Sequence, residues 1–402
     1  MKNFLVIAQD LRISGTSEGI VSRSFIAGLR KSYPTSIIQI AYLKHSKYDD
    51  RLDLLPVDDI SIYPIKIKVP LITKLVNKLY WRITHISLNE EYKYNVYKKI
   101  ISGIECSVYD HVFIRSSGLE YETILGAKDL PILKKAIINF HDPYPVLWDT
   151  GSRTATNGLE LFRLKRMWQV VAQAKVCISP ATLLSEDLEH LYGSATPFKT
   201  LPHQFESSVF DFFDNNLVRH KQKKITISYH GAIQFGRNID ILLDAYTLLL
   251  TEDTLIKNET EFVLRLRGQQ NKRLKAKYKE INNIIILDCL DFSNSANEQQ
   301  TQADIFIILE NCSPHSNILP GKVPFLAFLE KPVLSLSPLR SEMRKIIKDE
   351  KYIATCNDAD EIKNKLENLI KHTMETSEPV YPFGDYFSDV AFKKKVDEII
   401  QS

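Results

Sequence analysis

Residues 225–238 of the chain, ITISYHGAIQFGRN, begin a new α/β segment in the middle of the sequence. The first five residues are mostly β-branched or aromatic, and Gly231 follows soon after, which predicts a strand that ends in a tight turn. Residues 239–250 then have the apolar spacing of a helix. A strand, a turn and a helix in this order are typical of parallel α/β structure. We therefore predict that a Rossmann-like domain starts here.

The same alternation of short apolar runs and helical segments continues on both sides of this stretch. On the N-terminal side we predict strands at 4–8, 36–42, 110–115, 135–140 and 175–179, and on the C-terminal side at 262–266, 284–287, 305–309 and 332–336. A chain of 402 residues exceeds the roughly 250–300 residues that one core supports, so two domains are expected. We predict a first domain at 1–215, a second at 222–380, and a C-terminal helix within 381–402 that crosses back to the first.

Composition and charge exclude several classes of protein. The net charge of +3 gives no overall basic surface for nucleic acid, and 44% hydrophobic with 25% charged residues is ordinary for a globular protein. The five cysteines form no CxxC pair, which argues against a disulfide framework or a zinc site. No run approaches the roughly 20 apolar residues of a membrane-spanning helix. We expect a cytoplasmic protein that does not bind nucleic acid.

Gly231 and Arg237 form the first candidate site of the second domain. Gly231 lets the chain turn tightly after its strand, and Arg237 lies shortly before the next predicted helix. A diphosphate could bind both the guanidinium group and the N-terminus of that helix. A lone arginine at a helix start is more often a solvated surface charge, so the prediction depends on strand, glycine and arginine together.

The loop SPHSNILPGK, at residues 313–322, is the second candidate site of this domain. Lys322 lies just before the predicted helix 325–329 and could neutralise a leaving diphosphate as its charge develops. An ordinary βα loop is the alternative. Polar groups that could hydrogen-bond a sugar are Glu310, His315, Ser316 and Asn317.

In the first domain, SGTSEG at residues 14–19 follows the first predicted strand. Small residues let backbone N–H groups and a helix N-terminus approach a ligand, often a phosphate or a sugar hydroxyl, so Gly15, Thr16 and Ser17 are candidate ligand-binding residues. A turn without any ligand is an equally weighted alternative. The stretch is not GxGxxG, which argues against a dinucleotide-dependent dehydrogenase.

His141 follows the predicted strand 135–140, at the sheet edge where ligands bind in doubly wound folds. Its imidazole could donate a hydrogen bond to a substrate hydroxyl, with the neighbouring Asp142 fixing the tautomer. The alternative is a His-Asp turn that only caps the next segment. We interpret His141 as a site residue.

Residues 66–82 alternate basic and apolar side chains. After Pro70 the spacing suits an amphipathic helix with Tyr80 and Trp81 as interfacial anchors. Such a face could contact anionic lipid at the inner face of the cell membrane. A helix that packs on the core with solvated lysines is the equally weighted alternative.

The two Rossmann-like halves, the Gly-Arg start of the second half and its lysine-containing loop together resemble the GT-B glycosyltransferases, most closely the retaining family 4. The resemblance covers nearly the whole chain and is densest at 174–179, 201–204, 231–238 and 303–334. It implies an α/β fold of two Rossmann-like domains that face each other across a cleft. The donor would bind mainly to the second domain and the acceptor mainly to the first, which makes Gly15, Thr16 and Ser17 candidate acceptor-binding residues. It also implies no cofactor and no metal, with the nucleotide sugar acting as co-substrate.

The resemblance assigns roles by position. Arg237 matches the second phosphate-binding basic residue of the family, whereas Ala232 stands where many members carry the first. His141 matches a histidine that contacts the transferred sugar.

The chain also departs from the family pattern. The paired glutamates of the family, laid on this sequence, fall at Asn317 and Phe325. The second glutamate holds the nucleotide ribose, and a phenylalanine cannot. Lys322 could serve the phosphates instead, as in members with a Pro-x-Lys loop.

We therefore predict transfer of a sugar from a UDP- or GDP-sugar to a polysaccharide, such as capsule or O-antigen, or to a lipid-linked oligosaccharide, with retention of configuration. The predicted catalytic residues are His141, Arg237 and Lys322. Two alternatives stay open. One is a sugar-nucleotide epimerase, which requires carboxylates at the strand ends of the first domain, where the sequence indicates only Asp142. The other is a catalytically silent sugar-nucleotide-binding subunit of a polysaccharide assembly complex.

Overall fold

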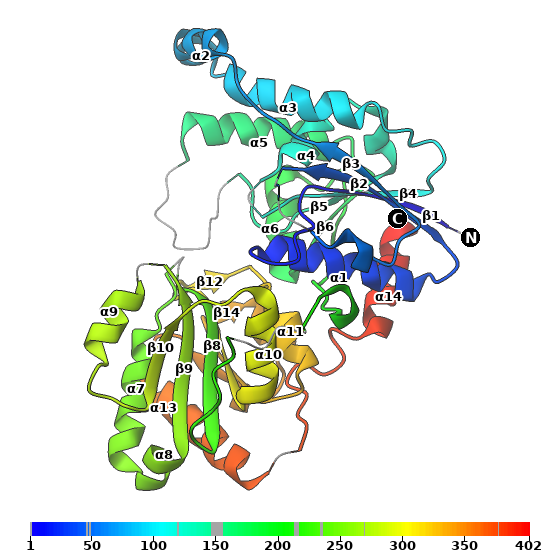
Figure 1. Ribbon diagram of the computed structural model, residues 1–402. Coiled ribbons are helices and arrows are strands. Elements are labelled where there is room, and N and C mark those ends of the chain that lie inside the picture. Colours follow the sequence, from blue (N-terminus) through cyan, green and yellow to red (C-terminus); the bar gives the residue numbers. More distant parts are fainter. Residues whose placement is uncertain are drawn as a thin grey trace. The chain divides into compact units, whose positions relative to one another are not determined.

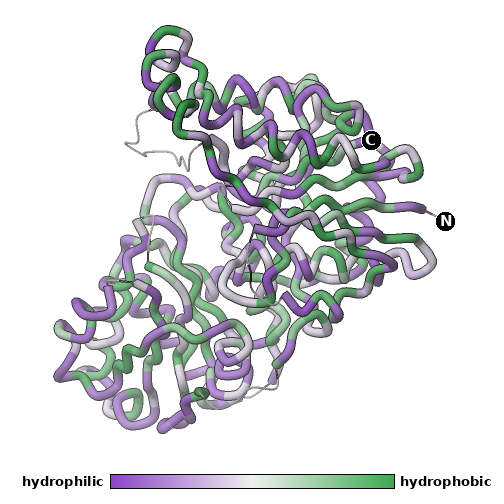
Figure 2. Tube along the Cα trace, turned by 45° about the horizontal axis from the view of Figure 1, so that its top comes forward, coloured by the Kyte–Doolittle hydropathy of each residue, from purple (hydrophilic) through white to green (hydrophobic). Residues whose placement is uncertain are grey.

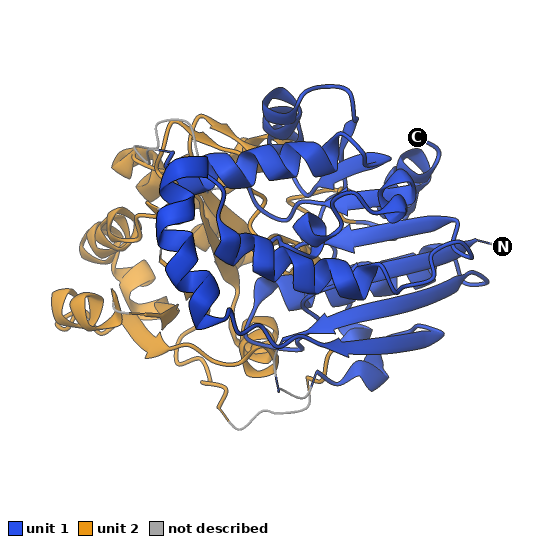
Figure 3. Cartoon of the chain, turned by 90° about the horizontal axis from the view of Figure 1, so that it is seen from above, with its two compact units in different colours: residues 1–148, 152–209, 388–402 blue, residues 149–151, 210–387 orange. Residues whose placement is uncertain are grey.

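The computed structural model describes residues 2–45, 47, 50–118, 120–145, 156–212, 217–233, 236–268, 270–376 and 378–402. The chain divides into two compact units (Figure 3). Unit 1 comprises residues 1–148, 152–209 and 388–402, and unit 2 comprises residues 149–151 and 210–387. Each unit is an α/β domain with its own parallel sheet.

The sheet of unit 1 has, in the described part of the chain, seven parallel strands in the order β3-β2-β1-β4-β5-β6-β7 (Figure 1). Its inner strands read as apolar runs because helices cover both faces of a parallel sheet, and residues 4–8 and 112–114 are buried. The strands are β1 (Asn3–Ala8), β2 (Ile37–Lys44), β3 (Asp59–Pro64), β4 (His111–Arg115), β5 (Ala136–Asn139), β6 (Val176–Ser179) and β7 (Phe198–Thr200).

Side-chain caps begin several helices of unit 1. Thr16 accepts a hydrogen bond from the backbone N–H of Gly19, Ser87 accepts one from the backbone N–H of Glu90, and Asn157 forms a capping box with Glu160. The α-helices are α1 (Ser17–Ser32), α2 (Leu71–Thr84), α3 (Leu88–Ile101), α4 (Glu122–Gly126), α5 (Gly158–Val171), α6 (Thr182–Tyr192) and α14 (Asp389–Ile400), with 3₁₀ turns at Leu52–Leu54, Pro131–Lys135 and Ser207–Val209.

The C-terminal helix α14 packs against α1. The rings of Phe392 and Phe25 meet edge to face with their centroids 6.1 Å apart. Gly28 of α1 faces the same ring, since a Cβ added there would lie 3.0 Å from Phe392. The hydroxyl of Tyr33 donates to Asp397 at 2.7 Å. Helix α14 therefore completes the hydrophobic core of unit 1 beside α1.

Unit 2 repeats the architecture with six parallel strands, again counting described residues, in the order β10-β9-β8-β11-β13-β15. The strands are β8 (Ile225–Ala232), β9 (Thr260–Arg267), β10 (Ile284–Asp288), β11 (Ile305–Leu309), β13 (Val333–Ser337) and β15 (Ile353–Thr355). Two short strands, β12 (His315–Ser316) and β14 (Arg340–Ser341), pair separately. The helices are α7 (Asp240–Glu252), α8 (Thr254–Glu259), α9 (Gln270–Lys277), α10 (Phe292–Gln302), α11 (Val323–Phe328), α12 (Glu342–Ile346) and α13 (Ala359–Glu375), with a 3₁₀ turn at Glu350–Tyr352.

Hydrophobic residues concentrate in the strands of both sheets (Figure 2). Among the helices that the structure describes, none is both long enough and apolar enough to cross a bilayer.

Candidate functional site

Each sheet reverses its strand order at one place. In unit 1 the reversal lies between β1 and β4, and in unit 2 it lies between β8 and β11. The loops that leave two such strands at their carboxyl ends diverge to opposite faces of the sheet, and the opening between them is where doubly wound folds bind ligands. These two places are therefore the candidate sites.

In unit 2, Lys322 lies between the ends of the two central strands. Its Nζ donates to the backbone carbonyls of Ile307 in β11, at 3.2 Å, and of His230 in β8, at 3.4 Å. The same ammonium lies 3.8 Å from the centroid of the Tyr229 ring. Burial, and then the positive charge of Arg237, lower the pKa of Lys322 well below its ordinary value. The predicted site residue is thus desolvated and held at the switch point.

Arg237 lies beside the same tyrosine. Its Nη1 donates to the carbonyl of Ala232 at 3.3 Å, and the hydroxyl of Tyr229 donates to that carbonyl at 2.9 Å. The Nε of Arg237 is buried and has no hydrogen-bond partner among the described residues. Within the same part of the chain, neither Arg237 nor Lys322 forms an ion pair with a carboxylate. Two basic side chains without a neutralising acid are suited to bind an anion.

Gly231 and Gly236 shape the loop that carries Arg237. Their φ angles of +147° and +76° are in the range that favours glycine. The backbone N–H of Cys312 donates to the carbonyl of Gly236 at 3.2 Å, so the loop after β8 is tied to the loop after β11. The intervening residues 234–235 of the predicted site lie outside the described residues.

Glu310 forms a second polar cluster at the end of β11. Its side chain is buried, and burial raises the pKa of the carboxyl to about 7. Hydroxyl groups of Ser337, Ser341 and Ser316 lower this pKa and so oppose the burial, and nearby Glu342 raises it further. The structure therefore brings Glu310 and Ser316 together, as part of a serine-lined cluster.

The remaining predicted donor-binding residues lie on the adjoining strand pair. His315 and Ser316 form β12, which pairs with Arg340 and Ser341 of β14, and Asn317 follows directly. All three predicted side chains are buried. Arg237 and Lys322, by contrast, are only partly buried.

Phe325 lies on α11 and is buried. Its ring meets that of Phe292, the first residue of α10, with centroids 6.1 Å apart. Phe292 in turn lies 4.9 Å from the ring of Phe210. The position that the resemblance gives to a ribose-binding glutamate therefore belongs to a packed aromatic cluster.

In unit 1, His141 lies in a buried cationic cluster. Nη2 of Arg115 is 2.9 Å from Nε2 of His141, and Oδ1 of Asn139 is 3.1 Å from the same atom. A guanidinium group only donates, so the Arg115 contact requires Nε2 to accept and Nδ1 to carry the proton, and the Asn139 amide fits this tautomer when its NH2 group, rather than its oxygen, faces Nε2. The imidazole of His203 lies edge-on at 5.5 Å. Burial and then the charge of Arg115 lower the pKa of His141 well below its ordinary value.

This arrangement corrects one expectation. We expected Asp142 to fix the tautomer of His141, but Arg115 does so, because it ends β4 beside β5. Arg115 is buried, and burial lowers its pKa to about 9. One feature of the sequence could have indicated Arg115 as a site residue: it is a charged residue directly after the apolar run of β4.

The predicted acceptor residues form a tightly bonded turn after β1. The hydroxyl of Thr16 caps α1 and donates to Asp10 at 2.9 Å, and Arg12 pairs with the same carboxylate at 2.6 Å. Gly15 has a φ of +92°, and the hydroxyl of Ser17 donates to Glu18. The turn is thus fixed by its own hydrogen bonds.

The strand ends of unit 1 carry more carboxylates than Asp142, the only one that the sequence indicated. Asp10 follows β1, and Glu122 follows β4 on α4. Asp10 is bound by Arg12 and Thr16. Burial raises the pKa of Glu122, and its Oε2 has no partner among the described residues. The sequence missed both because neither follows an apolar run directly.

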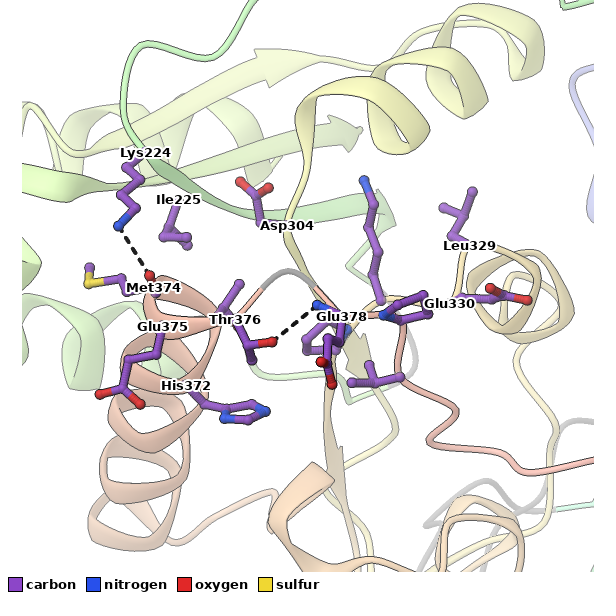
Figure 4. A pocket seen from close by; sticks show the side chains of 15 residues that line it. Lys224, Ile225, Asp304, Leu329, Glu330, His372, Met374, Glu375, Thr376 and Glu378 are labelled. Carbon is purple, nitrogen blue, oxygen red and sulfur yellow. Dashed lines mark hydrogen bonds between the residues drawn. The ribbon is translucent and has the colours of Figure 1, made fainter.

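The pocket drawn in Figure 4 lies at the opposite edge of the unit 2 sheet. It has a volume of about 570 Å³, and its lining includes Ile225, Asp304 and Pro332, which stand at the starts of β8, β11 and β13. Doubly wound sheets bind their ligands at the carboxyl ends of strands rather than here. None of the predicted site residues lines this pocket.

Two Rossmann-like units, each with a polar site at its switch point, define the class of fold. The chain has the α/β GT-B fold, as the sequence predicted, and its solved structural neighbours include glycosyltransferases and sugar-nucleotide epimerases. No family model matches the chain, and no curated protein matches it in sequence.

Three solved structures show the extent of the likeness. The apo form of the lipopolysaccharide outer core galactosyltransferase WaaB has a TM-score of 0.61 and 14% identity, with 99% of each chain covered. Anabaena Alr3699/HepE, in complex with UDP and glucose, has a TM-score of 0.59 and 12% identity, with 100% of each chain covered. The UDP-GlcNAc 2-epimerase from Neisseria meningitidis, bound to UDP-GlcNAc, has a TM-score of 0.57 and 13% identity, also at 100% of both chains. At these identities the likeness establishes the fold.

Proposed function

We propose that the protein is a glycosyltransferase that moves a sugar from a UDP- or GDP-sugar to a polysaccharide or lipid-linked oligosaccharide acceptor. The observation that carries this proposal is the pair Arg237 and Lys322 beside Tyr229, two cations at a switch point without a carboxylate partner among the described residues. A diphosphate has the charge and size to bind between them. UDP and UDP-GlcNAc in two of the structural neighbours support a donor of this class.

The chemistry follows from where charge develops. The bond between the anomeric carbon and the diphosphate oxygen breaks, and the acceptor hydroxyl oxygen forms the new bond to that carbon. Negative charge grows on the leaving diphosphate, and Arg237 and Lys322 would stabilise it in a site with little water. In a retaining reaction the acceptor attacks from the same face, and the departing phosphate takes its proton.

For unit 1 we propose a positioning role for His141. Its Nε2 accepts from Arg115, so the Nδ1–H remains to donate to a sugar hydroxyl. The lowered pKa keeps the imidazole neutral at pH 7. It would therefore bind a hydroxyl without adding a positive charge.

A second candidate function, sugar-nucleotide epimerisation, is favoured by Glu122. A carboxyl group with a raised pKa at a switch point is suited to act as an acid or a base. An epimerase would need such a group and no acceptor.

Calorimetry with UDP, GDP, dTDP, ADP and NAD tests the donor site. We expect selective binding of one nucleoside diphosphate, weakened about 10- to 100-fold by Arg237→Ala and by Lys322→Ala, because each removes a charged hydrogen bond of roughly 1.5–3 kcal/mol. Lys272→Ala, an exposed lysine of the same unit, is the matched control and should bind as the wild type does. Binding of NAD alone, or of no nucleotide, would show that the proposal is wrong.

Turnover then separates the candidate functions. With the selected sugar nucleotide and a glycan acceptor, a transferase releases the nucleoside diphosphate only when the acceptor is present. An epimerase forms a new sugar nucleotide without an acceptor. Nucleotide binding without either product would identify a catalytically silent subunit.

A further inference from the structure

Helix α2 exposes its apolar side. Ile72, Leu75, Val76, Leu79 and Ile83 recur at helical spacing and share one face, and their side chains are between 50% and 75% exposed. No residue of α2 is buried. An amphipathic helix ordinarily turns its apolar face to the core, so α2 has the reverse orientation. In Figure 1 it stands at the top of unit 1, beside the N-terminal end of α3.

The other side of α2 attaches the helix to unit 1. Oδ1 of Asn77 accepts from the backbone N–H of Leu88, at the start of α3, at 2.7 Å. The Trp81 ring packs edge-on against Phe162 of α5, and a Cβ added at Gly158 would lie 3.3 Å from it. We expected Trp81 to be an interfacial anchor, but it is half-buried in this contact. The polar face and one tryptophan thus hold the helix while its apolar face stays outside.

The flanking charge has one sign. Residues 65–89 contain no aspartate or glutamate, and their cations are Lys66, Lys68, Lys74, Lys78 and Arg82. All five are exposed, and none forms an ion pair in the part of the chain that the structure describes. On the helix, Lys74, Lys78 and Arg82 follow one another at a spacing of four residues and border the apolar face.

We propose that α2 is a docking surface for the anionic surface of a lipid bilayer, with the apolar face inserted between headgroups and the lysines bound to their phosphates. An apolar face beside a row of lysine and arginine is the arrangement of helices that lie in a membrane interface. The helix has 14 residues and is about 21 Å long, which is shorter than the roughly 30 Å hydrocarbon layer, so it lies in the surface and does not span it.

The charges also argue against a second copy of this chain as the occupant. A two-fold contact through α2 would place Lys74, Lys78 and Arg82 of one copy against the same residues of the other, because such an interface uses the same patch twice. No acidic residue of the surrounding segment is there to neutralise them.

Flotation of the full chain with vesicles tests the proposal. We expect binding to vesicles of phosphatidylglycerol and phosphatidylcholine, weaker binding at high salt, and little binding to phosphatidylcholine alone. Lys74→Glu/Lys78→Glu and, separately, Ile72→Asn/Leu79→Asn should each lower the partition coefficient at least tenfold. Because these side chains are exposed, far-UV circular dichroism and the melting temperature should stay as in the wild type.

Lys272→Glu/Lys275→Glu on the basic helix α9 makes the same change of net charge in unit 2 and is the matched control, expected within twofold of the wild type. If the control lost as much vesicle binding as Lys74→Glu/Lys78→Glu, the net charge of the protein alone would explain the binding, and the proposal would be overturned. Failure of the wild type to bind anionic vesicles would also overturn it, as would a dimer in sedimentation velocity that Ile72→Asn/Leu79→Asn abolishes. The assay needs no sugar nucleotide, so its result is independent of the proposed activity.

Discussion

The ammonium group of Lys322 lies over the ring of Tyr229, 3.8 Å from its centroid. The face of an aromatic ring carries partial negative charge, so it attracts the cation without neutralising it. Two backbone carbonyls hold the same group, at 3.2 and 3.4 Å. Lys322 is therefore oriented by neutral groups, and no described acidic side chain pairs with it in place of a ligand.

This environment predicts that diphosphate binding takes up protons. Burial lowers the pKa of Lys322 in the free protein, and a bound dianion raises it again. Affinity should therefore fall as the pH rises above the pKa of the free lysine, by up to about tenfold per pH unit. Calorimetry in two buffers of different ionisation enthalpy should give net proton uptake over the pH range in which the affinity falls. Lys322→Arg should bind without uptake, because its guanidinium stays charged. Equal uptake in this variant would contradict the prediction.

Buried histidines predict loss of stability in mild acid. Burial lowers the pKa of His203 to about 3 and that of His141 well below its usual value, whereas an unfolded imidazole has a pKa of about 6.5. Below that pH only the unfolded chain takes up these protons, so the free energy of unfolding falls as pH falls. Each histidine contributes a loss of about 1.4 kcal/mol per pH unit. Melting temperatures measured from pH 7.5 to 5.5 should therefore decrease. His203→Gln should have a smaller slope, and an unchanged slope would refute this assignment.

The fold could be predicted because each unit repeats one local pattern. All of the strands expected from apolar runs are present, with ends shifted by a few residues, and β11 has the expected bounds of 305–309. The strands β3, β7 and β15 were not predicted, because they lie at or near sheet edges, where partial exposure breaks the apolar run. Strand β8 continues to Ala232, beyond the expected end at 229, because pairing with β9 extends through Gly231.

The candidate sites were harder to predict than the fold, because side chains from separate parts of the chain come together in them only after folding. Arg237 and Lys322 could be proposed from their positions after strands, but the ring of Tyr229 that both approach is part of an ordinary apolar strand in sequence. Likewise, the contact between Arg115 and His141 joins neighbouring strands that lie 26 residues apart in the chain. No local spacing encodes such a pair.

Cys312 should be the most reactive thiol of unit 2 near neutral pH. The neighbouring thiol of Cys356 stabilises its thiolate and lowers the pKa of Cys312 to about 7. A larger share of Cys312 than of an ordinary thiol is then thiolate near neutral pH. Brief maleimide labelling followed by peptide mass spectrometry should modify Cys312 before the exposed Cys289. In Cys356→Ser, Cys312 should be labelled by maleimide only as fast as Cys289. Equal labelling rates of the two thiols in the wild type would contradict the prediction.

Phe325 tests whether the missing glutamate of the glycosyltransferase pattern is compatible with this fold. The side chain is buried and its ring meets that of Phe292 with centroids 6.1 Å apart, so a carboxylate placed there would be buried against an aromatic ring. Burial without a partner favours the protonated form of a glutamate and raises its pKa in the folded state. We expect Phe325→Glu to destabilise unit 2.

The pH dependence distinguishes this cause from lost packing. A glutamate whose folded pKa is raised loses stability as the pH rises above its unfolded pKa of about 4.3, by about 1.4 kcal/mol for each unit of the shift. Phe325→Leu loses part of the ring contact, about 1–2 kcal/mol, at every pH. The melting temperature of Phe325→Glu should therefore fall between pH 5 and 8 relative to Phe325→Leu. A parallel pair of curves would mean that the position accepts a solvated carboxylate, and Phe325 would then be a replaceable residue at the mouth of the site rather than part of the packed aromatic cluster.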